Sequence, residues 1–230
     1  MNLKVSIMKK SLLLTTAAIL AMSTAASAAT LSLTGGVAGS IPESGQTNEV
    51  LENVFGFAPG DFLSGGLFGS QIEVDSDTTV TVSYWGYEAS AKNSFTLNGT
   101  TPSATFNTIP FGNPGFGAQY AADALTPLAT QTVDVLAGEL DFEFTTNIPG
   151  SGFSAANGSN PLNTPGGFAN FYSWMSAGSE TVFLFFDDTG AGDDDNHDDF
   201  VVSLSVNGTP PPAPNPVPLP AGGLLLVGGL

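Results

Sequence analysis

The chain has 230 residues, with 28 glycines, 16 prolines, 17 phenylalanines and no cysteine, and its formal net charge is −17. Three of its four cationic residues lie in the first ten positions, whereas all 21 acidic residues lie beyond position 28. Nucleic acids and anionic lipid surfaces are bound through Lys and Arg, so this charge argues against both as partners. The glycine and proline content is typical of many turns between short strands, and the lack of cysteine excludes a disulfide framework.

The N-terminal segment, residues 1–29, predicts a signal peptide. Two lysines precede the apolar run Leu12–Ala21, and small residues follow it up to an Ala-Ser-Ala site that ends at Ala28. A charged region, a short apolar region and a small-residue cleavage site are the features that signal peptidase recognises. The apolar run is too short to cross a bilayer. We therefore expect cleavage after Ala28 or Ala29 and an exported protein.

Residues 30–208 predict an all-β domain, an antiparallel β-sandwich of the jelly-roll or Ig-like kind with very little helix. Short runs rich in Val, Phe and Thr alternate with turn residues at the spacing of a sandwich. The strands expected in chain order are Thr30–Leu33, Ile72–Val74, Thr79–Trp85, Ser94–Leu97, Ser103–Thr108, Gln131–Leu136, Leu140–Thr145, Phe168–Trp174, Thr181–Phe186 and Phe200–Val206.

The segments between these strands have weaker patterns. Glu49–Phe57 is compatible with either a short helix or a strand, and Ala118–Ala124 favours a helix. Gly60–Ser70 and Ile148–Gly167 are rich in Gly and predict loops. Asn98-Gly99 predicts a tight hairpin turn, because this dipeptide suits the φ angles of a two-residue turn.

The loop between the last two strands, Asp187–Asp199, is the main chemical feature of the chain. It holds seven aspartates in thirteen residues, and Lys92 is the only cationic residue beyond position 10. Two carboxylates about 4 Å apart repel by roughly 4 kcal/mol at an effective dielectric constant near 20. The loop can therefore either extend into water, where salt screens its charges, or wrap a hard cation with its oxygens.

If the loop wraps a hard cation, the expected site is a Ca²⁺ site. Its candidate ligands are Asp187, Asp188, Asp193, Asp195, Asp198 and Asp199. Their spacing does not fit an EF-hand, which needs Glu at its twelfth position. Glu88 is expected to be a surface or locally hydrogen-bonded carboxylate, with a place in the site as the alternative. His197 is the only histidine. Since zinc would need further His or Cys ligands, we expect a solvated or aspartate-paired imidazole on an exposed loop.

The aromatic residues leave two readings open. Tyr84, Tyr87 and Tyr172 accompany Trp85 and Trp174 on predicted strands, where aromatic side chains usually belong to the core. Alternatively, Trp85 and Trp174 contact a glycan.

A third reading of the chain is a hydrolase with paired carboxylates. The sequence has no Gly-x-Ser-x-Gly motif, no arginine and no cysteine nucleophile, so we do not expect an enzyme.

The composition changes after Gly208. Residues 209–216 are a Pro-rich extended linker. Residues 217–230 begin with the motif Val217, Pro218, Leu219, Pro220 and Ala221 and continue as an apolar run to Leu230. That run is shorter than the roughly 20 residues of a membrane span. We therefore expect the sequence to stop partway through a hydrophobic segment.

This motif resembles the VPLPA-type C-terminal sorting signal, a variant of the PEP-CTERM tail of Gram-negative bacteria. The body resembles one group of these proteins at Trp85–Ala89, Asn93–Phe95, Phe142–Thr145, Asn157–Pro161 and the acidic loop. The resemblance implies processing by an exosortase-like membrane enzyme, with transient membrane anchoring through the C-terminal segment alone. It implies delivery to the outer surface or the extracellular matrix, often alongside exopolysaccharide production.

The sequence predicts an exported structural protein of the cell surface or matrix with an acidic loop, for which a solvated turn and a Ca²⁺ site both stay open. The alternatives are a carbohydrate-binding module for exopolysaccharide and a secreted hydrolase.

Overall fold

The computed structural model describes residues 28–42, 49–107, 117–148, 154–165, 168–178, 180–191, 195–208 and 214. The predicted signal peptide up to residue 27, the linker apart from Pro214, the sorting motif Val217–Ala221 and the candidate ligand Asp193 lie outside the described residues. In the part of the chain that is described, no helix has the length and hydropathy that a membrane span requires.

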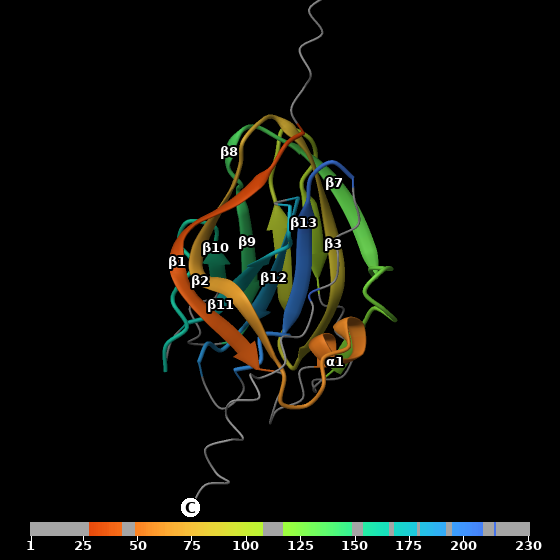
Figure 1. Ribbon diagram of the computed structural model, residues 1–230, viewed down its shortest axis with the longest axis vertical. Helices are drawn as coiled ribbons and strands as arrows, with labels where there is room; N and C mark the ends of the chain where they lie inside the picture. The colour runs from red at the N-terminus through yellow and green to blue at the C-terminus, as the bar shows by residue number, and fades with distance from the viewer. Residues whose placement is uncertain are drawn as a thin grey trace, which may run out of the picture.

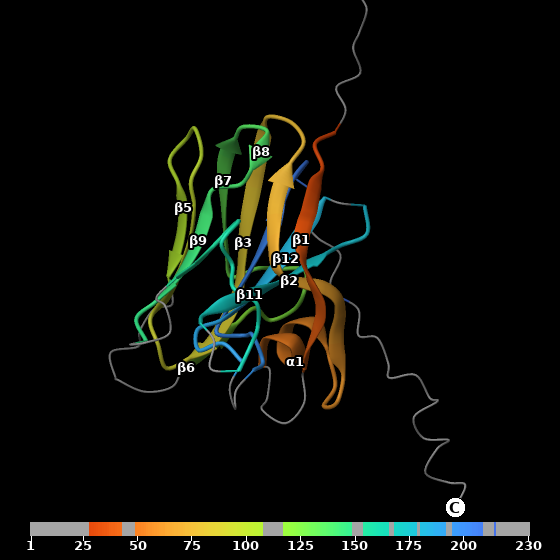
Figure 2. The same cartoon turned by 90° about the vertical axis from the view of Figure 1, so that its left-hand side faces the viewer.

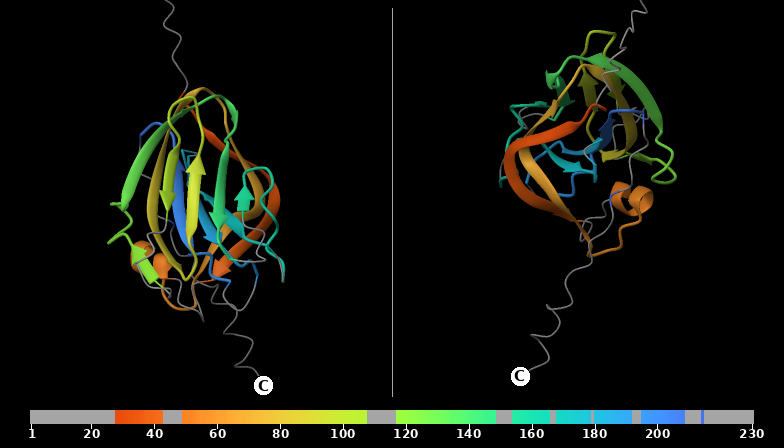
Figure 3. Two further views of the ribbon diagram at one scale, coloured as in Figure 1. Left: turned by 180° about the vertical axis from the view of Figure 1, so that it is seen from behind. Right: turned by 45° about the horizontal axis from the view of Figure 1, so that its top comes forward.

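The described strands form two antiparallel sheets that pack face to face (Figures 1 and 2). In the described residues the large sheet has nine strands, in the order β1 (Leu31–Pro42), β2 (Phe62–Val74), β11 (Asn170–Met175), β12 (Thr181–Asp187), β13 (Phe200–Ser205), β3 (Thr78–Ala89) and β6 (Gly117–Tyr120), with β7 (Ala129–Val135) also beside β3 and β8 (Gly138–Glu139) beside β2. The small sheet, seen in front of the large one in the left view of Figure 3, has the order β10 (Ser154–Ala156), β9 (Phe142–Thr146), β4 (Asn93–Leu97) and β5 (Ala104–Asn107). The prediction of an all-β antiparallel sandwich is confirmed.

Strand β12 lies inside the large sheet and is buried on both faces. Its even-numbered residues, such as Phe186, belong to the core between the two sheets, where the Phe186 ring stacks on Phe144 of β9 at 4.7 Å. Its odd-numbered residues Phe183 and Phe185 face a second apolar cluster that includes helix α1 (Glu49–Phe55). Burial on both faces is the reason why this strand appears in the sequence as an unbroken apolar run.

The prediction of a loop at Gly60–Ser70 is wrong, because β2 runs through most of this segment. The reason is visible at Gly66. A Cβ atom there would collide with the ring of Tyr172 and the carbonyl oxygen of Ser173, so only glycine lets β2 approach β11 this closely. The Gly66 N–H also donates to the Tyr172 hydroxyl at 2.7 Å. Gly66 therefore marks a close approach of two strands rather than a loop.

Three further predictions are wrong, and one segment that the sequence left open is now assigned. The segment Ala118–Ala124 is not helical, because its first residues form β6 and pair with the end of β3. Residues Glu49–Phe57, which the sequence left open, contain α1. The hairpin of β4 and β5 is present, but the whole of residues 98–103 connects its strands, so the tight turn at Asn98-Gly99 is wrong. The predicted loop Ile148–Gly167 contains β10.

Candidate functional site

The acidic loop Asp187–Asp199 lies at one end of the sandwich, where Phe186 of β12 pairs with Phe200 of β13. Three of its described aspartates are buried rather than extended into water. The exposed fraction is 0% for Asp187 and Asp198 and 3% for Asp188. The prediction of a solvated loop is therefore wrong for these three carboxyl groups, because the surrounding strands and loops cover them.

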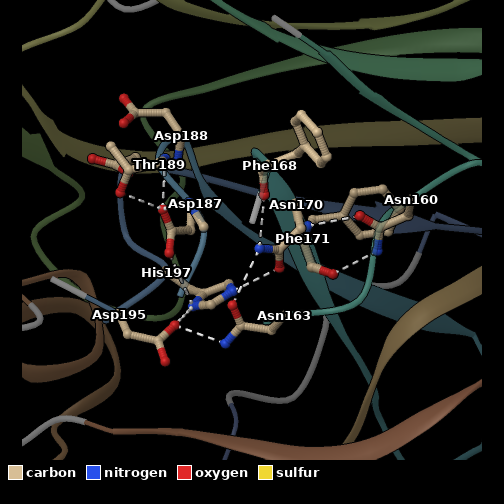
Figure 4. Close-up of polar contacts among 12 residues, drawn as sticks. Asn160, Asn163, Phe168, Asn170, Phe171, Asp187, Asp188, Thr189, Asp195 and His197 are labelled. Atoms are coloured by element: carbon tan, nitrogen blue, oxygen red, sulfur yellow. Dashed lines mark hydrogen bonds and ion pairs between the residues drawn. The ribbon is translucent and has the colours of Figure 1, made fainter. Parts of the chain in front are cut away.

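Asp187 is the last residue of β12, and its two carboxylate oxygens have different surroundings (Figure 4). Oδ1 accepts hydrogen bonds from the Thr189 and Gly190 N–H groups, each at 2.8 Å, and from the Thr189 hydroxyl at 3.1 Å. Oδ2 is buried and has no hydrogen-bond partner among the described residues. Burial raises the pKa of Asp187 to about 7, although the bonds from Thr189 and Gly190 lower it. Oδ2 is thus a buried acceptor that a cation would satisfy.

Asp188 and Asp199 tie the loop to both sheets. Asn93 of β4 donates from Nδ2 to Asp188 Oδ2 at 2.7 Å, which joins the small sheet to the loop. The Asp188 N–H donates to Asp199 Oδ2 at 2.8 Å. Burial raises the pKa of Asp199 well above its usual range, and the charges of Asp188, Asp187 and Asp198 raise it further. The ionised form of this cluster is therefore costly without a counter-charge.

Among the described residues there are two groups of potential metal ligands, each with ligand atoms within 4.8 Å of one another. The first is Asp187, Asp188 and Asp199, and the second is Asp187, Asp195 and His197. Five of the six predicted calcium ligands are described, and four of them fall into these groups. The fifth, Asp198, belongs to neither group, and its carbonyl oxygen accepts from the Glu88 N–H at 2.9 Å. Glu88 thus joins the loop through its backbone.

His197 is fully buried, so the prediction of an exposed loop position is wrong, and its ring lies beside the carboxylates of Asp195 and Asp187. Its backbone has a φ of 59°, in the left-handed region, and its ring packs against Phe68 at 5.2 Å. Nδ1 lies 3.4 Å from Asp195 Oδ1 and 3.9 Å from Asp187 Oδ2. Burial lowers the pKa of His197 to about 3, and the backbone of Asp195 acts in the opposite direction. The imidazole is therefore neutral.

A chain of amides supports the other side of this ring (Figure 4). His197 Nε2 lies 2.9 Å from Asn170 Oδ1. Asn170 Nδ2 donates to Asn163 Oδ1 at 3.3 Å, and Asn163 Nδ2 donates to Asp195 Oδ1 at 2.7 Å. Asn160 fixes this loop by exchanging two hydrogen bonds with the backbone of Phe171. Sequence reasoning did not find these asparagines, since they lie in or beside a predicted loop without periodicity.

The aromatic residues are mostly core. Trp85 is 1% exposed, its Nε1 donates to Ser203 Oγ at 3.0 Å, and its ring packs against Phe55 and Phe183. The prediction that Trp85 contacts a glycan is wrong, because a buried ring offers no face to a sugar. Trp174 is half-buried, and its Nε1 donates to the Ser64 carbonyl oxygen at 3.2 Å.

No protein-family model matches the chain, and no curated protein matches it.

Proposed function

We propose that this chain is an exported, C-terminally sorted structural protein of the cell surface or extracellular matrix, and that its acidic loop binds Ca²⁺. One observation carries the calcium part of the proposal. Asp187, Asp188 and Asp199 bring their carboxylates into one group, and two of these side chains are almost completely buried.

Electrostatics favours a cation in this group. Carboxylates about 4 Å apart repel by roughly 4 kcal/mol at an effective dielectric constant near 20, and burial removes the water that would screen them. Lys92 is the only Lys or Arg after position 10, and it is exposed. The chain thus offers little positive charge of its own, whereas Ca²⁺ takes six to eight oxygen ligands in a flexible geometry. Three carboxylates and nearby carbonyl oxygens fit that requirement.

The position of the group suits a structural role. Asp187 ends β12, Asp199 directly precedes β13, and Asp188 accepts a hydrogen bond from Asn93 of the small sheet. A cation held there would join the ends of two central strands and the neighbouring sheet. Its binding would therefore stabilise the sandwich as a whole rather than a single loop.

Export and sorting are supported by the two ends of the sequence. The N-terminal segment has the features of a signal peptide, and residues 217–221 resemble a VPLPA-type sorting motif. The proposed partners are accordingly signal peptidase and an exosortase-like enzyme. Outside the cell, Ca²⁺ sites with dissociation constants near 10⁻⁴ to 10⁻³ M are occupied, so a weak site is sufficient.

The test is calorimetric titration of the metal-free protein with CaCl₂. We expect saturable binding that Asp188→Asn and Asp199→Asn each weaken at least tenfold. The matched control is Glu143→Gln, which removes one exposed negative charge from β9 and is expected to leave the affinity unchanged. Equal affinity in all four proteins would contradict the proposed site, and so would equal weakening in all three variants, because only the net charge would then matter.

A further inference from the structure

We propose that His197 Nδ1, Asp187 and Asp195 bind a divalent transition-metal ion, and that Asn170 and Asn163 position the imidazole for it. This site shares Asp187 with the proposed calcium group but contains a nitrogen donor and does not depend on calcium binding.

The starting point is the direction of a buried ring nitrogen. His197 has an exposed fraction of 0%, and its Nδ1 makes no hydrogen bond with any of the residues that the structure describes. Nδ1 nevertheless faces two carboxylate oxygens, Asp195 Oδ1 at 3.4 Å and Asp187 Oδ2 at 3.9 Å (Figure 4). We therefore expect a ligand between these three atoms that can interact with all of them.

The amide chain decides which ring nitrogen carries the proton. Asn170 Nδ2 faces two acceptors, Asn163 Oδ1 at 3.3 Å and the Phe168 carbonyl oxygen at 3.4 Å. This assigns Oδ1 of Asn170 to the histidine side, where it accepts from Nε2–H at 2.9 Å. Nδ1 then presents its lone pair to the carboxylates. A ligating histidine usually donates its second N–H to an oxygen in this way, which fixes the tautomer and the ring orientation.

A lone pair facing two carboxylates is repulsive unless a positive charge lies between them. A metal ion supplies it without protonating the ring, and neutral imidazole is the form that binds metals.

The distances suit a small ion. Two ligands that each lie 2.0–2.1 Å from a tetrahedral metal ion are about 3.4 Å apart, and Nδ1 lies 3.4 Å from Asp195 Oδ1. Asp187 Oδ2 is slightly farther, at 3.9 Å from Nδ1. Imidazole with carboxylates suits Zn²⁺, Co²⁺ or Mn²⁺, whereas Ca²⁺ and Mg²⁺ prefer oxygen alone. The expected ligand is therefore a first-row divalent transition metal.

The experiment uses the purified chain without a histidine tag, so that its single histidine gives the only imidazole signals. Co²⁺ is added to the metal-free protein, visible absorption is recorded, and Zn²⁺ is then used to displace it. Imidazole ¹⁵N resonances are followed with Zn²⁺. We expect one saturable Co²⁺ site, loss of its absorption on Zn²⁺ addition, and a shift of the Nδ1 resonance.

The variants give matched comparisons. Asp195→Asn and Asp188→Asn each remove one charge, but only Asp195 belongs to the histidine group. We expect Asp195→Asn to abolish the Co²⁺ spectrum at concentrations that saturate the wild type, and Asp188→Asn to retain it. Asn163→Ala, which removes a positioning residue, is expected to weaken Co²⁺ binding about 10–100-fold. His197→Asn keeps a residue that tolerates the left-handed backbone and is expected to lose the site.

The inference is overturned if Zn²⁺ leaves the imidazole resonances unchanged, or if Asp195→Asn binds Co²⁺ as the wild type does. If His197→Asn does not fold, Asp195→Asn and the resonances decide the matter alone. The calcium proposal fails separately, through the absence of Ca²⁺ binding, so Co²⁺ binding without a calcium effect would uphold the inference and reject calcium as the ion.

Discussion

Asn93 on the small sheet donates a hydrogen bond of 2.7 Å to Asp188, which follows β12 of the large sheet. Both side chains are buried, so this bond links the acidic loop to the second layer of the sandwich. Replacement of Asn93 by Ala would leave the Asp188 carboxylate without this donor. We expect the free energy of unfolding to fall by about 1–3 kcal/mol, measured by urea unfolding.

The control for this variant is Asn107→Ala, which removes an exposed amide from β5. Surface substitutions of this kind usually change the free energy of unfolding by no more than about 0.5 kcal/mol. If the two variants were equally stable, the bond between Asn93 and Asp188 would contribute nothing to joining the layers.

The two tryptophans should behave differently on truncation. Trp85 is buried and bonded to Ser203, so Trp85→Ala is expected to destabilise the protein by about 3–5 kcal/mol. Trp174 is half-buried, so Trp174→Ala should lower the free energy of unfolding by less and leave the protein folded. The structural role also predicts that Trp174→Ala leaves retention on exopolysaccharide unchanged. Loss of retention in the folded variant, measured by affinity electrophoresis, would favour the carbohydrate-binding alternative.

The acidic loop shows what the sequence could and could not predict. The buried strand β12 and the charged loop after it could be predicted from the sequence, because an apolar run and a cluster of aspartates are local properties. The burial of Asp187 and His197 could not be predicted, since it depends on Phe68 from β2 and on Asn170, which are distant in sequence. The segment around Gly66 was likewise predicted to be a loop. The need for glycine at this position comes from Tyr172, which is 106 positions away in the sequence.

Tyr172 predicts a stability change in alkali. Burial raises its pKa to about 12, although the Gly66 N–H lowers it, whereas an unfolded tyrosine ionises near pH 10. The contribution of the neutral phenol is therefore complete below pH 10 and is lost as the pH rises through 12. Tyr172→Phe should be less stable than wild type by about 1–3 kcal/mol at neutral pH, because buried hydrogen bonds to Gly66 and Gly39 are lost.

The stability difference between wild type and Tyr172→Phe should narrow above pH 10 in denaturant titrations. A difference that stays constant from pH 8 to pH 12 would show that the phenol does not remain protonated longer in the folded protein.

The proposed sorting step makes a prediction about location. Replacement of Pro218 and Pro220 by Ala alters the motif without touching the described domain. In a Gram-negative host with an exosortase-like enzyme, we expect the variant to be cleaved by signal peptidase but to fail to reach the outer surface. Cell fractionation with immunoblotting measures this. Equal surface delivery of variant and wild type would remove the sorting role of residues 217–221.

The central claim, a calcium ion that stabilises the sandwich, is tested most directly by thermal unfolding of the purified protein in EDTA and then in increasing Ca²⁺. A ligand at 100 times its dissociation constant stabilises by about 2.7 kcal/mol, which corresponds to a rise of several degrees in Tm. The account predicts a saturable rise that Asp188→Asn weakens and Glu143→Gln retains. If NaCl of equal ionic strength raises Tm as much as CaCl₂ does, the aspartates are only screened and the calcium site is contradicted.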